Sequence, residues 1–405
     1  MDISFHSSSL PSVTTQSNLA PKTRELIRLA QNEAKAARVA LAQLTTEEQV
    51  AVVCETPLAM RMRILSLIET PEDLVPLIPE AELCFTCKTA GIESASWLIA
   101  LASPQQVVAC VDLDAWSGLM PDVGKLDGWL NAIVEAGEDT IHTAATSLDP
   151  EMLAIYLRAH ADVEIKPSGD EDWQPPEGGQ TLEGQFYVIG RKKNDDLSSL
   201  MRMLQVLFQK DYWLYFRLMH SVREEALSEI QEWALRWRTG RLEDLGFPTW
   251  DRAMRIYGML RPSQLAELPE SVHFIETEGW DLPVWITDLP GDVDARDRLL
   301  MAIGELDEQE RSQFFFAFIA LANQIAVADQ RDLGDAETLP ETLQKAIRVC
   351  RLGLEHIAQK NNLDDPTTLR RVSPERLFRV GVNIAPEGVR PGFTQGEDLS
   401  DGEVE

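Results

Sequence analysis

WALRWRTGRLEDLGFPTWDRAMRIYGMLRP, residues 233–262, contains two helical patterns separated by a sharp break. Trp233 and Trp237 recur at helical spacing with Ile230, which predicts a common apolar face for the helix before the break. Gly246 has no Cβ, so it can adopt the left-handed backbone conformation that ends a helix. The stretch therefore predicts a stiff corner between two helices.

The residues after the break predict a second helix, with Trp250, Ala253 and Tyr257 on one face. The Thr249 hydroxyl is expected to accept a hydrogen bond from the first turn of this helix, because threonine is a favoured N-cap. Pro262 then fits the first turn of a further helix. A corner of this kind is first of all a packing device.

Arginines are concentrated at this corner, although the chain as a whole is strongly acidic. One hypothesis is a surface that binds a small anion or a partner protein. Its candidate residues are Arg236, Arg238, Arg241, Asp244, Trp237 and Tyr257. The alternative is internal pairing with nearby carboxylates such as Glu229, Glu243 and Asp251, and the sequence favours it because most such charges are solvated or structurally paired.

The charge of the whole chain limits the classes of partner. The chain has 405 residues and a net charge of −29, so it repels phosphate backbones and anionic membrane surfaces. The most apolar run, residues 314–328, is too short to span a bilayer comfortably and predicts a buried core helix. We expect protein partners, no nucleic acid and no membrane insertion.

The cysteines and the N-terminus bear on the compartment. The chain has five cysteines, and residues 1–18 lack the basic region and apolar core of a secretory signal. Cysteines in such a chain are expected to stay reduced, which predicts a cytoplasmic protein.

The pattern of helices and breaks predicts a mainly α-helical protein with two domains. Pro-initiated short helices, as at Ser103-Pro104 and Asp149-Pro150, cannot stand alone and must stack on their neighbours. The predicted segments are a disordered N-terminus (1–20), an irregular helical-repeat, superhelical domain (21–163), an acidic Pro/Gly linker (164–184), a second helical domain with at most a short β-hairpin (185–385), and a disordered acidic tail (386–405).

Short β-prone segments occur only in the second predicted domain. QFYVIG at 185–190 alternates and predicts a strand, while SVHFIE at 271–276 and LPVWIT at 282–287 are possible strands or extended packing segments.

The sequence contains few candidates for chemistry. Cys84 and Cys87 form a CxxC pair, but the second close pair of a zinc site is missing, and Cys54 and Cys110 lie in apolar helical contexts. Asp112 and the neighbouring Asp114 could reach a divalent ion, although solvated carboxylates at a helix end are the favoured interpretation. HExxH, GxSxG, P-loop and GxGxxG motifs are absent. We therefore predict no catalytic residue, cofactor or metal.

Four segments together carry a resemblance to a known family: ASPQQVVACVDLDAWSG (102–118), LDGWLNAIVEAGEDTI (126–141), RLEDLGFP (241–248) and SPERLFRVGVNI (373–384). Over most of residues 40–385 the chain resembles an uncharacterised family of bacterial proteins with a domain of unknown function. The resemblance implies no catalytic residues. The N-terminal helices also resemble the intracellular superhelical domain of MgtE-type magnesium transporters, which regulates through contacts and ion binding.

Stacked short helices, an acidic surface and the lack of a catalytic motif predict an interaction or regulatory scaffold rather than an enzyme. Two alternatives stay open. One is a small-anion-binding protein or enzyme with a pocket at residues 233–257. The other is a metal-responsive module that uses the Asp112 region or Cys84 and Cys87.

Overall fold

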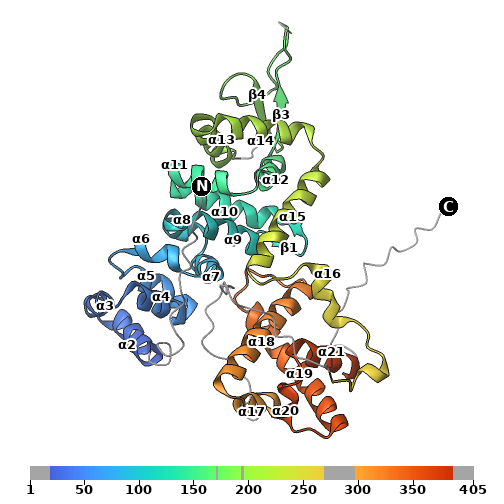
Figure 1. The fold of residues 1–405 in the computed structure, drawn as a ribbon. Helices are drawn as coiled ribbons and strands as arrows, with labels where there is room; N and C mark the ends of the chain where they lie inside the picture. Colours follow the sequence, from blue (N-terminus) through green and yellow to red (C-terminus); the bar gives the residue numbers. More distant parts are fainter. Residues whose placement is uncertain (1–18, 170–171, 193–195, 269–296, 386–405) are drawn as a thin grey trace, which may run out of the picture. The chain divides into compact units, whose positions relative to one another are not determined.

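The computed structural model describes residues 19–169, 172–192, 196–268 and 297–385, and these are mainly α-helical, as predicted (Figure 1). The predicted acidic tail, the possible strands at 271–276 and 282–287, and the predicted disordered N-terminus up to residue 18 lie outside the described residues.

The described chain divides into two compact units. The first unit contains the residues up to Leu245 together with Asp332–Ala336, and the second contains the remainder from Gly246 onward. The units therefore part at the predicted corner, whereas the predicted linker 164–184 lies within the first unit.

Short helices build the first unit, and each buries an apolar stripe against its neighbours. They are α2 (Leu19–Asn32), α3 (Ala34–Leu41), α4 (Thr46–Glu55), α5 (Leu58–Leu65), α6 (Pro71–Leu74), η1 (Val75–Leu77), α7 (Glu80–Ala90), η2 (Glu93–Ala95), α8 (Ser96–Leu101), α9 (Pro104–Asp114), α10 (Val123–Ala136), α11 (Glu138–Ser147), α12 (Pro150–His160), α13 (Ser198–Lys210), α14 (Tyr212–Glu224) and α15 (Leu227–Asp244). Their lengths vary widely, and a superhelical repeat is not shown.

The helix predicted to begin at Ser103-Pro104 is present, and Ser103 and Gln106, whose spacing in the sequence predicts a capping box, form one. The Ser103 hydroxyl accepts a hydrogen bond from the Gln106 N–H at 3.1 Å, and the Gln106 side chain accepts one from the Ser103 N–H at 2.8 Å. The buried Gln106 amide also donates to the carbonyls of Val75 and Ile78. Asp149 precedes Pro150 in the same way but makes no side-chain cap, because its carboxylate binds an arginine from another helix.

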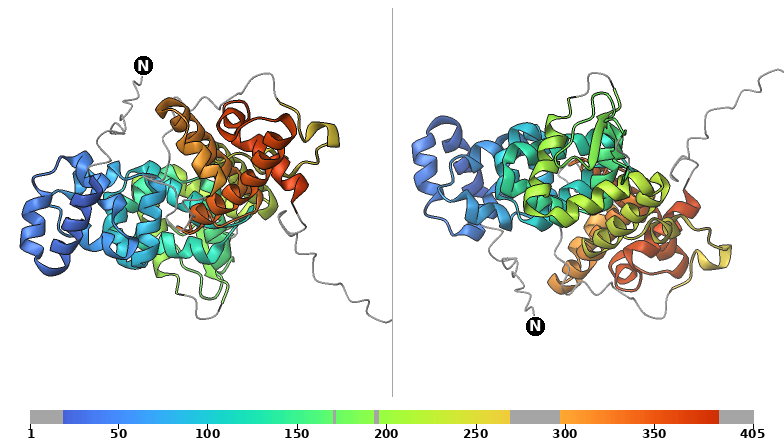
Figure 2. Two further views of the ribbon diagram at one scale, coloured as in Figure 1. Left: turned by 90° about the horizontal axis from the view of Figure 1, so that it is seen from below. Right: turned by 90° about the horizontal axis from the view of Figure 1, so that it is seen from above.

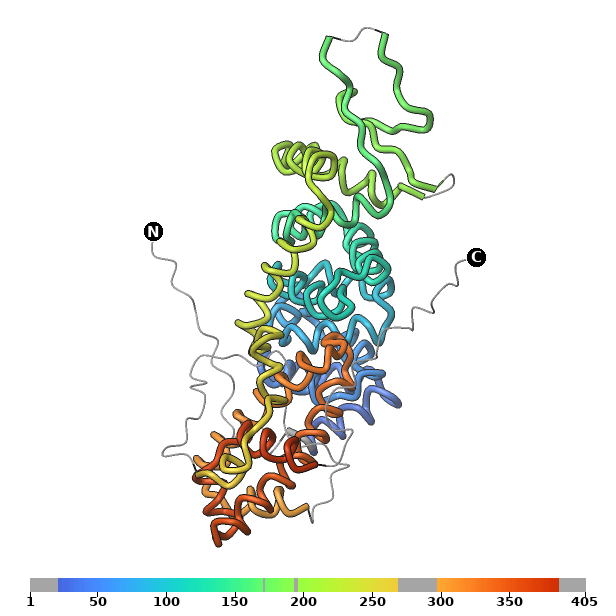
Figure 3. Tube along the Cα trace, turned by 90° about the vertical axis from the view of Figure 1, so that its right-hand side faces the viewer, coloured from blue at the N-terminus to red at the C-terminus, as the bar shows by residue number. Residues whose placement is uncertain are grey.

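Among the described residues, two small antiparallel two-stranded sheets complete the first unit. The sequence allowed a short hairpin only in the second predicted domain, whereas the first of these sheets lies within the predicted helical-repeat domain 21–163. They are β1 (Trp116–Ser117) with β2 (Met120–Pro121), and β3 (Ala161–Ile165) with β4 (Phe186–Gly190). The strand predicted at 185–190 is confirmed as β4, but its partner β3 comes from before the predicted linker. The described part of segment 164–184 thus includes the end of β3 and, at Gln180, a bridge to Val188 of β4, near the top of Figure 3.

Buried and more exposed residues alternate along the strands of the second hairpin, and this alternation explains which of its faces packs. Val163 and Val188 pair in register and are both buried. Phe186, also buried, meets the rings of Tyr215 and Phe216 of α14 edge-on at centroid distances of 6.0 and 5.7 Å. One face of the hairpin is therefore part of the hydrophobic core.

Helices also build the second unit, and α18, α19 and α21 lie side by side in it (Figure 2). Its elements are α16 (Trp250–Ala253), η3 (Met254–Tyr257), η4 (Pro262–Gln264), α17 (Arg298–Gly304), α18 (Glu308–Ala328), α19 (Thr338–Asn361), α20 (Asp365–Leu369) and α21 (Pro374–Ile384).

The apolar run at 314–328 is the core helix that the sequence predicts. Phe314, Phe318 and Ile319 of α18 are almost fully buried. Within the described residues, no helix combines the length and the hydropathy needed to cross a membrane.

Helices α19 and α21 approach each other until their backbones touch. A Cβ at Gly353 would collide with the Leu377 carbonyl oxygen, and one at Gly381 would collide with the Val349 carbonyl oxygen. Because backbone atoms cannot move aside as a flexible side chain can, both positions require glycine.

The predicted break at Gly246 is present. Gly246 has a φ of 82° in the left-handed region, and the Thr249 hydroxyl accepts a hydrogen bond from the Arg252 N–H at 3.4 Å. The helix that follows is shorter than predicted. Helix α16 ends at Ala253, and the chain then tightens into the 3₁₀ turn η3, which the N–H of Gly258 closes on the Arg255 carbonyl.

Candidate functional site

Helix α15 carries most of the predicted site and has two chemically different faces. Its inner face holds Ile230, Ala234 and Leu242, which are buried. This face packs on α12, α9 and β2. The outer face carries exposed side chains, so the helix separates the predicted site residues into two groups.

Arg241 on the inner face binds two carboxylates at once. Its guanidinium donates to both oxygens of Asp112 at 2.6 and 2.9 Å, and to both oxygens of Asp149 at 2.8 and 2.6 Å. Asp112 lies near the end of α9 with only 2% of its surface exposed, while Asp149 precedes α12. Paired bonds of this kind are among the strongest polar contacts in proteins, so Arg241 joins α15 to two other helices.

Arg238, one turn earlier, binds the backbone of the same region. Its Nε donates to the Asp112 carbonyl at 2.7 Å, and its Nη1 donates to the Gly118 carbonyl at 3.3 Å. The guanidinium lies 4.6 Å from the ring centre of Trp116 in β1. Burial lowers the pKa of Arg238 to about 10, which still leaves it charged at neutral pH.

Burial and hydrogen bonding shift the pKa of Asp112 in opposite directions, and they do the same for the pKa of Arg241. Burial raises the pKa of Asp112 above its usual value, although the hydrogen bonds from Arg241 act in the opposite direction. For Arg241, burial alone would lower the pKa, but its hydrogen bonds to Asp112 and Asp149 outweigh burial and raise it. Arg241 therefore keeps its charge and supplies the compensation that the buried carboxylate needs.

Asp114 belongs to the same polar cluster. Its carboxylate accepts hydrogen bonds from the Lys88 ammonium at 2.6 Å and from the Trp129 indole N–H at 2.9 Å. Lys125 beside it donates to Asp332 at 2.6 Å. The expectation that the two aspartates of this helix are solvated is therefore wrong, because only 2% of each residue is exposed and both carboxylates accept hydrogen bonds from other helices.

The outer face of α15 presents two tryptophans to solvent. Trp233 and Trp237 are 45% and 50% exposed, and their rings stack with centroids 6.1 Å apart. The Arg236 guanidinium lies 5.1 Å from the ring centre of Trp233. The sequence placed both tryptophans on one apolar face with Ile230, but the structure covers only Ile230.

Two further residues lie on the outer face. Asp244 is exposed in the last turn of α15. Gly240 is also exposed, and apart from its two chain neighbours and the nearby backbone of its own helix, no described heavy atom lies within 4 Å of the position that a Cβ would take.

Tyr257 belongs to the second unit, whereas Arg236, Arg238 and Arg241 belong to the first. Its hydroxyl donates to Asp329 at 2.7 Å, and the Lys345 ammonium donates to the other oxygen of that carboxylate at 2.6 Å. The predicted site residues thus divide into an outer group with Arg236, Trp237 and Asp244, an inner group with Arg238 and Arg241, and Tyr257 in the second unit.

The CxxC pair lies in the core. Cys84, Cys87 and Cys110 are buried between α7 and α9 as free thiols. A hydrogen bond with Cys84, together with burial, raises the pKa of Cys110, and burial raises the pKa of Cys87. In the part of the chain that the structure describes, no group of three or more His, Cys, Asp or Glu side chains is arranged to hold a metal ion.

Comparison with known proteins gives one match. Residues 39–387 match a family described as a family of unknown function, DUF6178. Neither the curated proteins nor the solved structures contain a match. The predicted resemblance to a family with a domain of unknown function is thus confirmed, while nothing supports the resemblance to MgtE-type transporters.

Arg241→Ala is expected to lower the free energy of unfolding by about 3–5 kcal/mol, because it leaves the buried Asp112 carboxylate uncompensated. Urea unfolding of the full chain measures this change. Arg202→Ala is the matched control, since Arg202 forms an exposed pair with Glu138 and its loss should cost about 1 kcal/mol or less. Equal losses in the two variants would contradict the assignment.

Proposed function

Since the chain belongs to the DUF6178 family of unknown function, we propose from its own contacts that it is a non-catalytic helical scaffold that binds a partner protein through α15. The docking surface is the outer face of this helix. It consists of Trp233, Arg236, Trp237, Gly240 and Asp244, and we refer to it as the tryptophan face.

The exposed aromatic rings are the main support for this proposal. Tryptophan and arginine are enriched among the residues that contribute most to protein–protein affinity. Trp233 and Trp237 contact each other, and Arg236 lies against Trp233, but about half of each tryptophan remains exposed. A protein partner that covered the face would bury this apolar surface and gain its transfer free energy.

Gly240 indicates the kind of partner. Glycine inside a helix costs about 1 kcal/mol relative to alanine, and no described neighbour of Gly240 requires the missing side chain. It lies about one helical turn after Trp237, on the exposed side of α15. A partner helix could approach the backbone closely at this point, so we assign the partner as a protein that presents an apolar helix.

The arginines of the inner face favour this function over small-anion binding at the corner. Arg241 donates to two carboxylates, and Arg238 donates to two carbonyls. An anion would have to displace these bonds and expose Asp112, which is costly. Arg238 and Arg241 therefore hold α15 in place, and the outer face makes the contact with the partner.

We place this activity in the cytoplasm. All five cysteines of the chain are free and buried, as expected of a protein that folds and functions in a reducing compartment.

Removing both rings tests the tryptophan face. We expect Trp233→Ala/Trp237→Ala to weaken partner binding by more than about tenfold, since central interface tryptophans typically contribute about 2 kcal/mol or more. Partners are captured on immobilised full-length chain from a native lysate of the source organism, and the affinity of each purified partner is then measured by calorimetry.

Trp213→Ala is the matched control, because Trp213 of α14 is 71% exposed but lies on another helix. Its affinity should equal that of the wild type. If the double variant captures the same proteins with the same affinities as the control, the proposed face is wrong. Loss of a concentration-dependent dimer in the double variant would identify the partner as a second copy of this chain.

Gly240→Ala separates binding from folding. The added methyl group enters open space, so we expect the free energy of unfolding to rise by about 0.5–1 kcal/mol. The same methyl group should weaken partner binding, because it prevents the closest approach of the partner helix. Urea unfolding and calorimetry measure the two effects, and a variant that is more stable and binds equally well would contradict the role of Gly240.

A further inference from the structure

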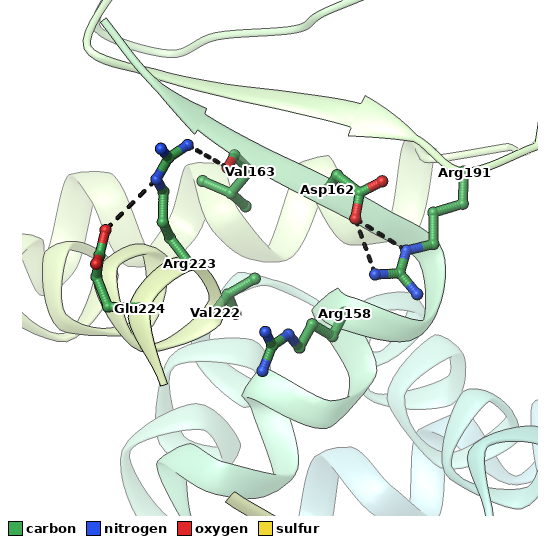
Figure 4. A pocket seen from close by; sticks show the side chains of 7 residues that line it. All are labelled: Arg158, Asp162, Val163, Arg191, Val222, Arg223 and Glu224. Atoms are coloured by element: carbon green, nitrogen blue, oxygen red, sulfur yellow. Dashed lines mark hydrogen bonds and ion pairs between the residues drawn. The ribbon is translucent and has the colours of Figure 1, made fainter. Parts of the chain in front are cut away.

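A hollow of about 290 Å³ lies beside the hairpin β3–β4 in the first unit, on elements other than α15 (Figure 4). Three arginines from three different elements line it: Arg158 of α12, Arg191 directly after β4, and Arg223 of α14. Val163 and Val222 supply the apolar part of the lining, which is otherwise made of charged side chains.

Two carboxylates balance part of this positive charge. Arg191 donates from Nε and Nη2 to the same oxygen of Asp162, at 3.1 and 2.8 Å. Arg223 lies 3.4 Å from a carboxylate oxygen of Glu224, and it donates a long hydrogen bond of 3.4 Å to the Val163 carbonyl. Both arginines thus keep a guanidinium nitrogen without a hydrogen bond to the described residues.

Arg158 is the least compensated of the three. Its Nη1 donates to the Glu225 carbonyl at 2.7 Å, which is a neutral acceptor. Among the described residues, no carboxylate forms an ion pair with Arg158, and its Nε and Nη2 make no hydrogen bond. Figure 4 shows the Arg158 side chain below Val222, with its guanidinium on the side away from Arg191.

We propose that this hollow binds a small oxyanion, a carboxylate or a phosphate, with Arg158 as its main partner. The lining has one positive charge in excess, in a chain whose net charge is −29. The guanidinium group offers a planar fork of donors that matches the oxygens of carboxylates and phosphates.

The size and lining of the hollow define the ligand further. Its volume is at the low end for ligand pockets, and its walls are almost entirely polar. The ligand is therefore a compact, highly polar molecule of a few carbons, either a dicarboxylate or a phosphate ester. The acidity of the whole chain argues against a nucleic-acid backbone as the source of the phosphate.

Calorimetry on the full chain tests the proposal with two probes, inorganic phosphate and succinate, at millimolar concentrations. We expect saturable binding of at least one probe, and the tighter probe identifies the ligand as a phosphate or a carboxylate. Arg158→Gln should weaken that binding by about tenfold or more, because it removes a charge-assisted contact. Arg223→Gln, a change at an exposed position, should weaken it as well.

Arg202→Gln is the control, since it removes the same charge from an exposed ion pair on α13 and should leave the affinity unchanged. The circular dichroism spectrum of each variant verifies its fold. The proposal is overturned if neither probe gives saturable heat, or if Arg202→Gln weakens binding as much as Arg158→Gln and Arg223→Gln do. The test is independent of the tryptophan face, because none of these substitutions alters the outer side of α15.

Discussion

A buried carboxylate without a positive partner costs several kcal/mol, and Asp112 is such a carboxylate unless α15 lies against α9. Arg241 supplies the missing charge and extends the same contact to Asp149 before α12. The preceding turn of α15 adds Arg238, which donates to the Asp112 carbonyl and covers the Trp116 ring. These bonds fix both the position of the helix and its rotation about its own axis.

The rotation of α15 determines which of its side chains remain available. With Arg238 and Arg241 bonded inward, α15 leaves Trp233 and Trp237 about half exposed and Gly240 exposed. A buried arginine and exposed tryptophans are each unusual, and α15 carries both, with Arg238 on its inner face and Trp233 and Trp237 on its outer face. The arginines of the first unit likewise differ in role according to how fully they are paired. Paired arginines stabilise the fold, while the incompletely paired Arg158 beside the hairpin is available to a ligand.

The sequence predicted correctly those features that are determined by residues close together along the chain. The apolar run at 314–328, the helix end at Gly246 and the cap at Ser103 all follow from nearest neighbours along the chain. The pairing of Arg241 with Asp112 spans 129 positions, and no periodicity can indicate such a partner. Helical spacing also placed Trp233 beside Ile230 correctly, but it cannot show where the neighbouring helices stop covering that side. The hollow combines residues from three separate elements, for which the sequence offers no common motif.

The central claim is that the inner bonds of α15 hold its tryptophans in solvent. Hydroxyl-radical footprinting of the full chain, with the oxidation rate of each tryptophan read by mass spectrometry, measures this directly. The account predicts that Trp233 and Trp237 are oxidised rapidly, whereas the buried Trp129 and Trp116 are protected. Protection of Trp233 and Trp237 to the same degree as Trp129 in the isolated chain would contradict it.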